Sequence, residues 1–206
     1  MLSKFLTFSI LIIYCSLSRF VFAETTLEKL IFDDTKPFHL KILEVVPKEA
    51  IIQIGADDSK NTIIEFMDYF CGYCKKVHPE LLQIAKERND TRVIFLQHPI
   101  LSESSKLLAN MVVSANMQGK GIEFHNALFE VEGSLNNEKL NQIIERLELN
   151  SAKLSIDVSK EEVSNIVKLS SFLANGSGAR GTPTFYINDE FVVGYISIQR
   201  IKALLK

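Results

Sequence analysis

Cys71-Gly72-Tyr73-Cys74 lies between a strand-like run at residues 62–67 (Thr-Ile-Ile-Glu-Phe-Met) and a helix-like run at residues 75–87. The two thiols therefore fall at the start of a helix, where the first N–H groups have no intrahelical partner and carry the positive end of the helix dipole. A thiolate at Cys71 is stabilised there, so its pKa falls and Cys71 is the expected nucleophile. Cys74 lies one turn further along, where it can form a disulfide with Cys71 or resolve a mixed disulfide by attacking the Cys71 sulfur.

The residues around this motif decide between a redox couple and half of a zinc site, which share the Cys-x-x-Cys pattern. Pro79 lies within an otherwise helical pattern and predicts a kink, because it cannot donate to the carbonyl of Lys75. Cys-Gly-x-Cys-Lys at residues 71–75, followed by this proline, resembles the thioredoxin superfamily. His78 could join the cysteines as a metal ligand, but a convincing fourth ligand is lacking, so we expect no metal and no other cofactor.

A second motif, Gly181-Thr182-Pro183-Thr184, leads into a pattern typical of a β-hairpin. The hairpin strands are expected at residues 185–187 and 191–194, on either side of a turn at residues 188–190. In the thioredoxin superfamily a cis-proline at this point packs beside the active cysteines, and the backbone of the residue before it pairs with substrate. The resemblance therefore implies a cis bond at Pro183 and a substrate-binding role for Thr182, together with Gly72 and Tyr73 of the first motif.

Residues 1–23 have the pattern of a cleaved signal peptide. Lys4 supplies the charged start, residues 5–17 are almost wholly apolar, and Val21-Phe22-Ala23 fits a cleavage site. An uncleaved membrane anchor is the alternative, but the apolar run is shorter than the ~20 residues that a span needs. The mature protein is expected to begin at Glu24 and to be periplasmic or otherwise exported.

Charge and cysteine content exclude other classes of protein. Without residues 1–23, 21 basic residues face 25 acidic ones, so neither a nucleic-acid partner nor an acidic lipid surface is indicated. Cys15 falls in the expected leader, which leaves Cys71 and Cys74 as the cysteines of the mature chain. A disulfide-stapled secreted scaffold uses more cysteines and spreads them apart, so this pair is better explained as catalytic.

The remaining patterns predict an α/β fold with a helical insertion. Two short helices are expected in an N-terminal extension at residues 24–50, at 26–34 and 38–46. Strands are expected at residues 51–54, 62–67 and 92–96, the last two forming a parallel pair around the active-site helix. The insertion spans about residues 102–176, with helices at 102–118, 122–131, 137–147 and from a Ser159–Glu162 capping box to about 175. A closing helix is expected at residues 197–205.

This order of elements resembles the DsbA-like branch of the thioredoxin superfamily over roughly residues 50–206. The resemblance rests on the two motifs and on Phe-His-Asn-Ala-Leu-Phe at residues 124–129. It implies thiol:disulfide exchange with protein substrates and recycling by a membrane redox partner. In some relatives an N-terminal extension drives oligomerisation, so a homo-oligomer through residues 24–50 is one hypothesis, although a stable coiled coil usually needs at least about 3–4 heptads.

Glu65 is a further candidate, because it lies in a strand whose two faces are otherwise apolar. Relatives place an acidic residue six positions before the first active cysteine, where it exchanges a proton with the second thiol, and Glu65 matches that place. Burial raises the pKa of such a carboxyl toward the range useful for proton transfer. The alternative is an edge-strand glutamate that reaches water. Asp68 is expected to make a local turn bond, and His98 and His125 to be packing or surface residues.

Three functions remain open at this stage. The first is an exported oxidase that passes a disulfide to protein thiols. The second is an isomerase or reductase, favoured by Thr182, since the residue before the proline departs from the oxidase pattern and its hydroxyl can bond a sulfur. The third is a metal-binding or chaperone module that uses the two cysteines differently. Strongly oxidising relatives have Pro-His between the cysteines; Gly72-Tyr73 lacks that second cation, which predicts a less extreme pKa for Cys71.

Overall fold

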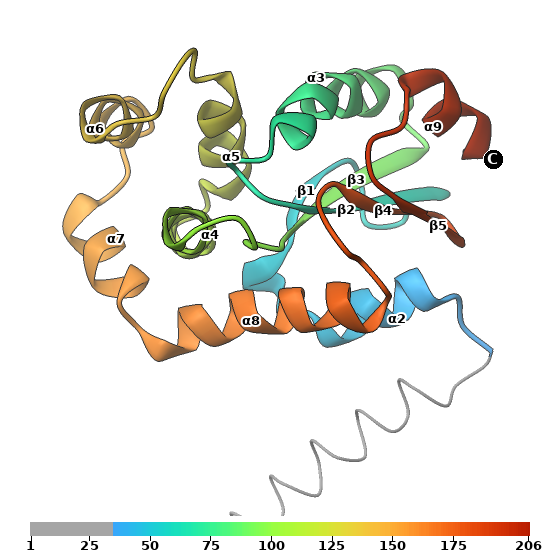
Figure 1. Cartoon of the computed structure of the whole chain (residues 1–206), viewed down its shortest axis with the longest axis horizontal. Helices are drawn as coiled ribbons and strands as arrows, with labels where there is room; N and C mark the ends of the chain where they lie inside the picture. The colour runs from blue at the N-terminus through green and yellow to red at the C-terminus, as the bar shows by residue number, and fades with distance from the viewer. Residues whose placement is uncertain (1–34) are drawn as a thin grey trace, which may run out of the picture.

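The computed structural model describes residues 35–206, and within them five strands form one central sheet (Figure 1). The strands are β1 (Ile52–Ile54), β2 (Asn61–Met67), β3 (Thr91–Gln97), β4 (Thr184–Ile187) and β5 (Glu190–Val193). Their order across the sheet is β1-β3-β2-β4-β5, with β2 and β3 parallel and every other neighbouring pair antiparallel. This confirms the predicted thioredoxin-like α/β class, the parallel pair and the C-terminal hairpin.

Helices cover both faces of the sheet (Figure 1). On one face lie α3 (Gly72–Glu87), which contains Pro79, and α9 (Ile198–Leu204). On the other lie α2 (Phe38–Val45) and α8 (Glu161–Gly176). Alternate residues of each strand point to opposite faces, so the sheet separates two cores. Ile63, Met67 and Phe95 pack under α3, whereas Ile64, Phe66 and Ile94 pack under α2 and α8.

The helical insertion between β3 and β4 contains one helix more than the sequence predicts. Its helices are α4 (Glu103–Asn116), α5 (Gly121–Glu130), α6 (Asn137–Arg146), α7 (Ser151–Val158) and α8. The sequence does not predict helix α7, because its eight residues bury only Leu154 and Asp157 and so give a weak apolar period. Asn150 caps it by accepting from the Lys153 N–H at 2.8 Å.

The predicted Ser159–Glu162 capping box is wrong. Ser159 ends α7 in a helical conformation, and its hydroxyl donates to the carbonyl of Ser155 at 3.3 Å. Lys160 takes the N-cap position of α8 and makes no side-chain capping bond. Because the preceding helix occupies Ser159, its side chain is directed backwards along the chain and cannot cap the helix that follows.

The described part of the N-terminal extension belongs to the same core as the sheet. Helix α2 follows the cap residue Pro37, and a short 3₁₀ turn (Lys48–Ala50) joins it to β1. Ile42 and Ala50 are fully buried in the cluster that contains Phe66. The helix predicted at 26–34 and the signal peptide predicted at 1–23 lie outside the described residues.

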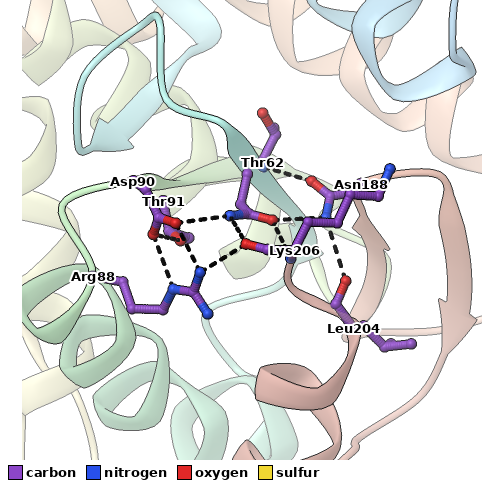
Figure 2. Close-up of polar contacts among 8 residues, drawn as sticks. Thr62, Arg88, Asp90, Thr91, Asn188, Leu204 and Lys206 are labelled. Atoms are coloured by element: carbon purple, nitrogen blue, oxygen red, sulfur yellow. Dashed lines mark hydrogen bonds and ion pairs between the residues drawn. The ribbon is translucent and has the colours of Figure 1, made fainter.

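A polar network fastens the C-terminal end of the fold to the start of β2 (Figure 2). The cysteines follow the opposite end of that strand. Asn188, which turns the β4–β5 hairpin at a φ of 52°, accepts from the Thr62 N–H at 3.0 Å and donates to the Leu204 carbonyl at 3.3 Å. Arg88 binds both Asp90 carboxylate oxygens at 2.9 and 2.8 Å and the main-chain oxygen of Lys206 at 2.9 Å. Asparagine tolerates a positive φ better than most residues. Asn188 therefore forms the turn with its backbone and positions α9 with its side chain.

Candidate active site

The start of α3 is held in place by Asp68. Its carboxylate accepts from the N–H of Phe70 at 2.9 Å, which is the local turn bond predicted for it. The second carboxylate oxygen accepts from the N–H groups of Ile100 and Leu101 at 2.9 and 3.0 Å, a pair of contacts that the sequence does not predict. Asp68 therefore joins the turn before the helix to the loop that follows β3, and its carbonyl accepts from the Cys71 N–H at 3.0 Å.

Cys71 is the N-cap residue of α3, and 9% of its surface is exposed. A hydrogen bond from the Cys74 thiol lowers its pKa most, and the Thr182 side chain and the N–H groups of Cys74 and Tyr73 act in the same direction. Burial opposes these effects, and the resulting pKa is about 5. Cys71 is therefore a thiolate at neutral pH and faces solvent enough to meet a substrate.

Cys74 has the opposite character, although it lies three residues away. It is fully buried, and desolvation, the hydrogen bond to Cys71 and the nearby Glu65 carboxyl all raise its pKa, so it stays a protonated thiol. Both cysteines are free thiols, and the structure therefore shows the reduced form of the pair. A disulfide between Cys71 and Cys74, which the sequence predicts, is the oxidised counterpart.

Glu65 lies on β2, paired with Phe95 of β3 and Phe185 of β4, and only 1% of its surface is exposed. Burial raises its pKa well above the ordinary value, while a hydrogen bond with Cys74 acts in the opposite direction. One carboxyl oxygen, Oε1, has no hydrogen-bond partner among the described residues. The structure thus places Glu65 in the core beside the buried thiol, not at an edge strand in contact with water.

Thr182 and Pro183 approach the active cysteines from the loop before β4. The bond between them is cis, and Cys71 Sγ lies 3.1 Å from the Thr182 carbonyl oxygen, to which the thiol donates when Cys71 is protonated. This brings the two motifs into contact across 111 positions of sequence. Of the middle dipeptide, Gly72 is exposed, and Tyr73 is 60% exposed and stacks on Tyr195, with ring centroids 5.8 Å apart.

Three residues near this site were not assigned a role from sequence. Tyr195 stacks on Tyr73 and donates to Glu80 at 3.2 Å, which gives the rim of the site an aromatic platform. Tyr69, which is partly buried, lies against the fully buried His125, with 2.7 Å between the hydroxyl and Nδ1. The available signal is a histidine inside the apolar pattern at residues 124–129, which by itself indicates only a packing or surface residue.

The metal alternative would require His78 to lie with the two cysteines as a ligand. No group of three or more histidine, cysteine or acidic side chains within residues 35–206 is arranged to hold an ion. His78 instead lies in the core, stacked on Phe129 with ring centroids 4.7 Å apart. Burial lowers its pKa to about 4, with Asn126 acting in the opposite direction.

The fold and the paired thiols together define a thioredoxin-like thiol:disulfide oxidoreductase of the DsbA-like type. The family model described as thioredoxin matches residues 48–206, so the chain belongs to the thioredoxin family. The disulfide bond formation protein D of Bacillus subtilis (strain 168) is 25% identical over 165 residues, which cover 74% of each protein.

Solved structures support the same class. A thioredoxin-like oxidoreductase from Silicibacter pomeroyi DSS-3 is 28% identical, with a TM-score of 0.71 over 77% of this chain and 91% of that one. A periplasmic thioredoxin-like protein from Salmonella enterica serovar Typhimurium is 25% identical, with a TM-score of 0.70 over 80% and 93%.

Part of a much longer protein also matches. The Na(+)/H(+) antiporter NhaA 3 of Salinispora tropica is 22% identical over 151 residues, 72% of this chain, and the chain spans only 23% of that protein's length. None of the helices in residues 35–206 combines the length and hydropathy that a membrane crossing requires.

Proposed function

We propose that this protein is an exported thiol:disulfide oxidoreductase that forms disulfides in secreted or periplasmic proteins through Cys71 and Cys74. The observation that carries this proposal is the contrast between the two thiols. Cys71 has a pKa of about 5 at the partly exposed start of α3, whereas Cys74 is buried and protonated. A protein that stabilises one thiolate strongly holds its reduced form well and gives up its disulfide readily.

The reaction begins from the Cys71–Cys74 disulfide. A substrate thiolate attacks Cys71 Sγ, the bond between the two cysteines breaks, and Cys74 leaves as a thiolate that takes a proton from the Glu65 carboxyl. A second substrate thiolate then attacks the substrate sulfur of the mixed disulfide and expels the Cys71 thiolate. The substrate gains a disulfide, the protein gains two electrons, and the low pKa of Cys71 makes it a good leaving group.

Thr182 and Pro183 serve this reaction as substrate-binding and catalytic residues, and Gly72 and Tyr73 complete the contact surface. The Thr182 carbonyl oxygen lies 3.1 Å from the Cys71 sulfur, beside the position that a substrate bonded to that sulfur would occupy. It can then accept from a peptide N–H of that substrate. Tyr73 and Tyr195 offer an apolar platform beside the same sulfur.

A second candidate function is disulfide isomerisation or reduction in the same compartment. Thr182 favours it, because its side chain lowers the pKa of Cys71 and so stabilises the thiolate that must attack a wrong disulfide. An isomerase is kept reduced by its membrane partner, and an oxidase is kept oxidised. If the protein assembles into a homo-oligomer through residues 24–50, that assembly would favour the isomerase.

Export and recycling are part of the proposal. The leader-like residues 1–23 and the likeness to a periplasmic protein of Salmonella support a periplasmic location, with a membrane anchor if the leader is not cleaved. A membrane redox partner whose disulfide accepts two electrons would reoxidise the protein. The substrates are proteins or peptides that carry cysteines, and neither nucleic acid nor a cofactor has a role.

Thiol trapping in cells that export the protein tests the direction of the reaction. Acid quenching followed by alkylation with a mass-shifting maleimide reports the redox state of Cys71 and Cys74. We expect a mostly oxidised pair, and purified protein should accelerate oxidative refolding of a reduced model substrate. A mostly reduced pair, with faster refolding of a scrambled substrate, would establish the isomerase instead.

A further inference from the structure

A groove lies on the surface between α4, α8 and the loop that follows β3, where α4 and α8 pack against each other (Figure 1). We call it the α4–α8 groove, and its volume is about 470 Å³. Ligand pockets in proteins have volumes of about 300–1,000 Å³, so this groove is large enough to receive part of another molecule. Its lining includes His98, Ile100, Lys106, Lys168, Ser171 and Phe172.

Two large apolar side chains line this groove and are open to solvent. Phe172, on the outer side of α8, is 66% exposed, and Ile100, in the loop after β3, is 46% exposed. Neither side chain is needed to hold α8 on the sheet, since that helix buries Val163, Ile166 and Leu173 in the core. Exposed apolar side chains that gather in one hollow mark a binding surface more often than isolated ones do.

The walls of the groove are held in place by contacts of His98, which is 1% exposed. Its backbone N–H donates to the Met67 carbonyl at 2.8 Å, which fixes the loop to the end of β2. Its ring Nδ1 lies 3.2 Å from the Ser171 hydroxyl, which fixes the same loop to α8. The groove is therefore formed before any ligand binds, and a preformed site loses less entropy on binding.

Asp68 connects the groove to the active site. One carboxylate oxygen accepts from the N–H of Phe70, which precedes Cys71, and the other accepts from those of Ile100 and Leu101. Phe70 and Leu101 are themselves exposed, so apolar surface continues from Cys71 to the groove. The Asp68 carbonyl also closes a turn onto the Cys71 N–H. Such a turn spans less than about 7 Å, so a peptide bonded to Cys71 reaches the groove with about three extended residues.

The charge of the groove is positive. It is lined by two lysines, and none of its lining residues in the described chain is acidic, whereas two other hollows of the surface contain glutamates. Lys106 is paired with Glu103 at 2.6 Å. Lys168 contacts the Asn165 amide oxygen at 3.3 Å and takes part in no ion pair among residues 35–206. Because Phe172 follows Lys168 by four positions, the two side chains are neighbours on α8.

We propose that the α4–α8 groove binds the substrate polypeptide beyond its cysteine, an inference that rests on the proposed function. A large apolar side chain of the substrate packs against Phe172 and Ile100, and a neighbouring carboxylate pairs with Lys168. Binding there raises the local concentration of the substrate thiol at Cys71. Because these contacts are the same before and during thiol exchange, they lower the half-saturating substrate concentration and leave the chemical step unchanged.

The experiment follows single turnovers of the oxidised full-length protein with an excess of reduced peptides. Each peptide carries two cysteines and a Leu-Glu anchor, placed about two to six residues from the nearer cysteine on either side, a range that brackets the expected reach. The reference peptide has Ser-Gln in place of the anchor. Quenched flow and chromatography measure peptide disulfide formation, and dithiothreitol serves as a dithiol too short to reach the groove.

The apolar contact is tested with Phe172→Ser. Wild type should bind the best-placed anchor with a half-saturating concentration about tenfold below that of the reference peptide, as expected for a favourable apolar contact at an interface. Phe172→Ser should remove most of this difference, while the limiting rate and the reaction with dithiothreitol stay within about twofold. Ile156→Ser is the matched control, because Ile156 is 63% exposed on α7 and does not line the groove.

The charged contact is tested with Lys168→Glu. This variant should bind Leu-Glu anchors more weakly and Leu-Lys anchors more tightly than wild type does, a reversal of preference that a merely structural effect would not produce. The preference should weaken as salt is added, since surface charges are screened. Lys86→Glu is the matched control, an exposed lysine of α3 that does not line the groove, and it should behave as wild type.

Equal half-saturating concentrations for anchored and reference peptides at every spacing would overturn the inference. So would an anchor preference that survives Phe172→Ser, or equal losses in Ile156→Ser. An apolar preference without charge reversal in Lys168→Glu would overturn the pairing with a carboxylate. The proposed function has a separate outcome: it fails if oxidised wild type converts no peptide dithiol, whereas only the groove fails if every peptide is oxidised equally well.

Discussion

The two faces of the central sheet are formed by the same strands but bury different kinds of side chain. The face under α3 and α5 buries Glu65, Cys74 and His78. The opposite face, under α2 and α8, presents Ile64, Phe66, Ile94 and Leu96, all of them fully buried. Because neighbouring residues of a strand point to opposite sides, Ile64 and Phe66 flank Glu65 in the chain and yet lie in the other core.

The difference between the two faces shows on which side of the sheet this domain buries polar and ionisable side chains. Apolar burial of about 25 cal/mol per Å² stabilises the α2–α8 side, and that side contains no active-site group. The α3 side accepts the buried carboxyl of Glu65 and the two buried imidazoles of His78 and His125. One face therefore stabilises the fold and the other carries the chemistry, and substitutions on the two faces should separate stability from activity.

The largest effect is expected at the cysteines. Cys71→Ser should abolish thiol exchange, because Cys74, the other cysteine among residues 35–206, is buried and stays protonated. Cys74→Ser should retain attack by Cys71 but accumulate mixed disulfides with exported proteins, since the resolving thiol is gone. Non-reducing gels of cells expressing each variant measure this, and a Cys74→Ser protein that traps nothing would contradict the resolving role.

On the apolar face, Phe66→Ala should lower the free energy of unfolding by about 3–5 kcal/mol, a large part of the stability of a domain of this size. Below its unfolding transition, the variant should keep the wild-type pKa and reactivity of Cys71. Denaturant unfolding and alkylation rates test the two halves of this prediction. Phe66→Leu is the milder control, and a changed Cys71 pKa in either variant would mean that the faces are coupled.

Glu65→Gln is the converse test on the chemical face. The step in which Cys74 attacks the mixed disulfide and releases the substrate should slow by about 10²-fold above neutral pH, where help from a general base is largest. The pH–rate profiles of wild type and Glu65→Gln should converge at acidic pH. Stability should hold or rise. The raised pKa means that folding of wild type requires proton uptake, so wild-type stability falls as pH rises above the unfolded carboxyl pKa, and Gln lacks this loss.

A smaller effect is the pH dependence of Cys71 itself. Its pKa of about 5 predicts alkylation of Cys71 with a midpoint near that pH, while Cys74 stays protected. Because this pKa is below the thiol value of 9.0 in the unfolded chain, the thiolate stabilises the reduced fold fully above pH 9. That contribution declines as pH falls and is absent below pH 5. The free energies of unfolding of reduced wild type and of Cys71→Ala, measured across this pH range, should therefore converge at acidic pH.

Local patterns in the sequence predicted most of the fold and the exposed half of the site. The cysteine spacing, the proline motif before the hairpin and the strand periods each follow from neighbouring residues. Helix α7 and the incorrect cap at Ser159 show the limit of this approach, because a short helix with few buried residues has hardly any period to detect. Asp68 shows a partial success, since its turn bond is local whereas its bonds to residues 100 and 101 are not.

The sequence by itself determined that Cys71 begins a helix and that Cys74 follows one turn later, because helix geometry is set by residues close together in the chain. That Thr182 meets the Cys71 sulfur followed from the family resemblance and not from neighbouring residues. The tertiary structure alone decided that Tyr69, His78 and His125 come together in the core. These contacts, like the one across 111 positions between Thr182 and Cys71, join segments far apart in the chain. Their burial, pKa values and unsatisfied atoms depend on which elements exclude water from them, and packing of the whole domain sets that exclusion.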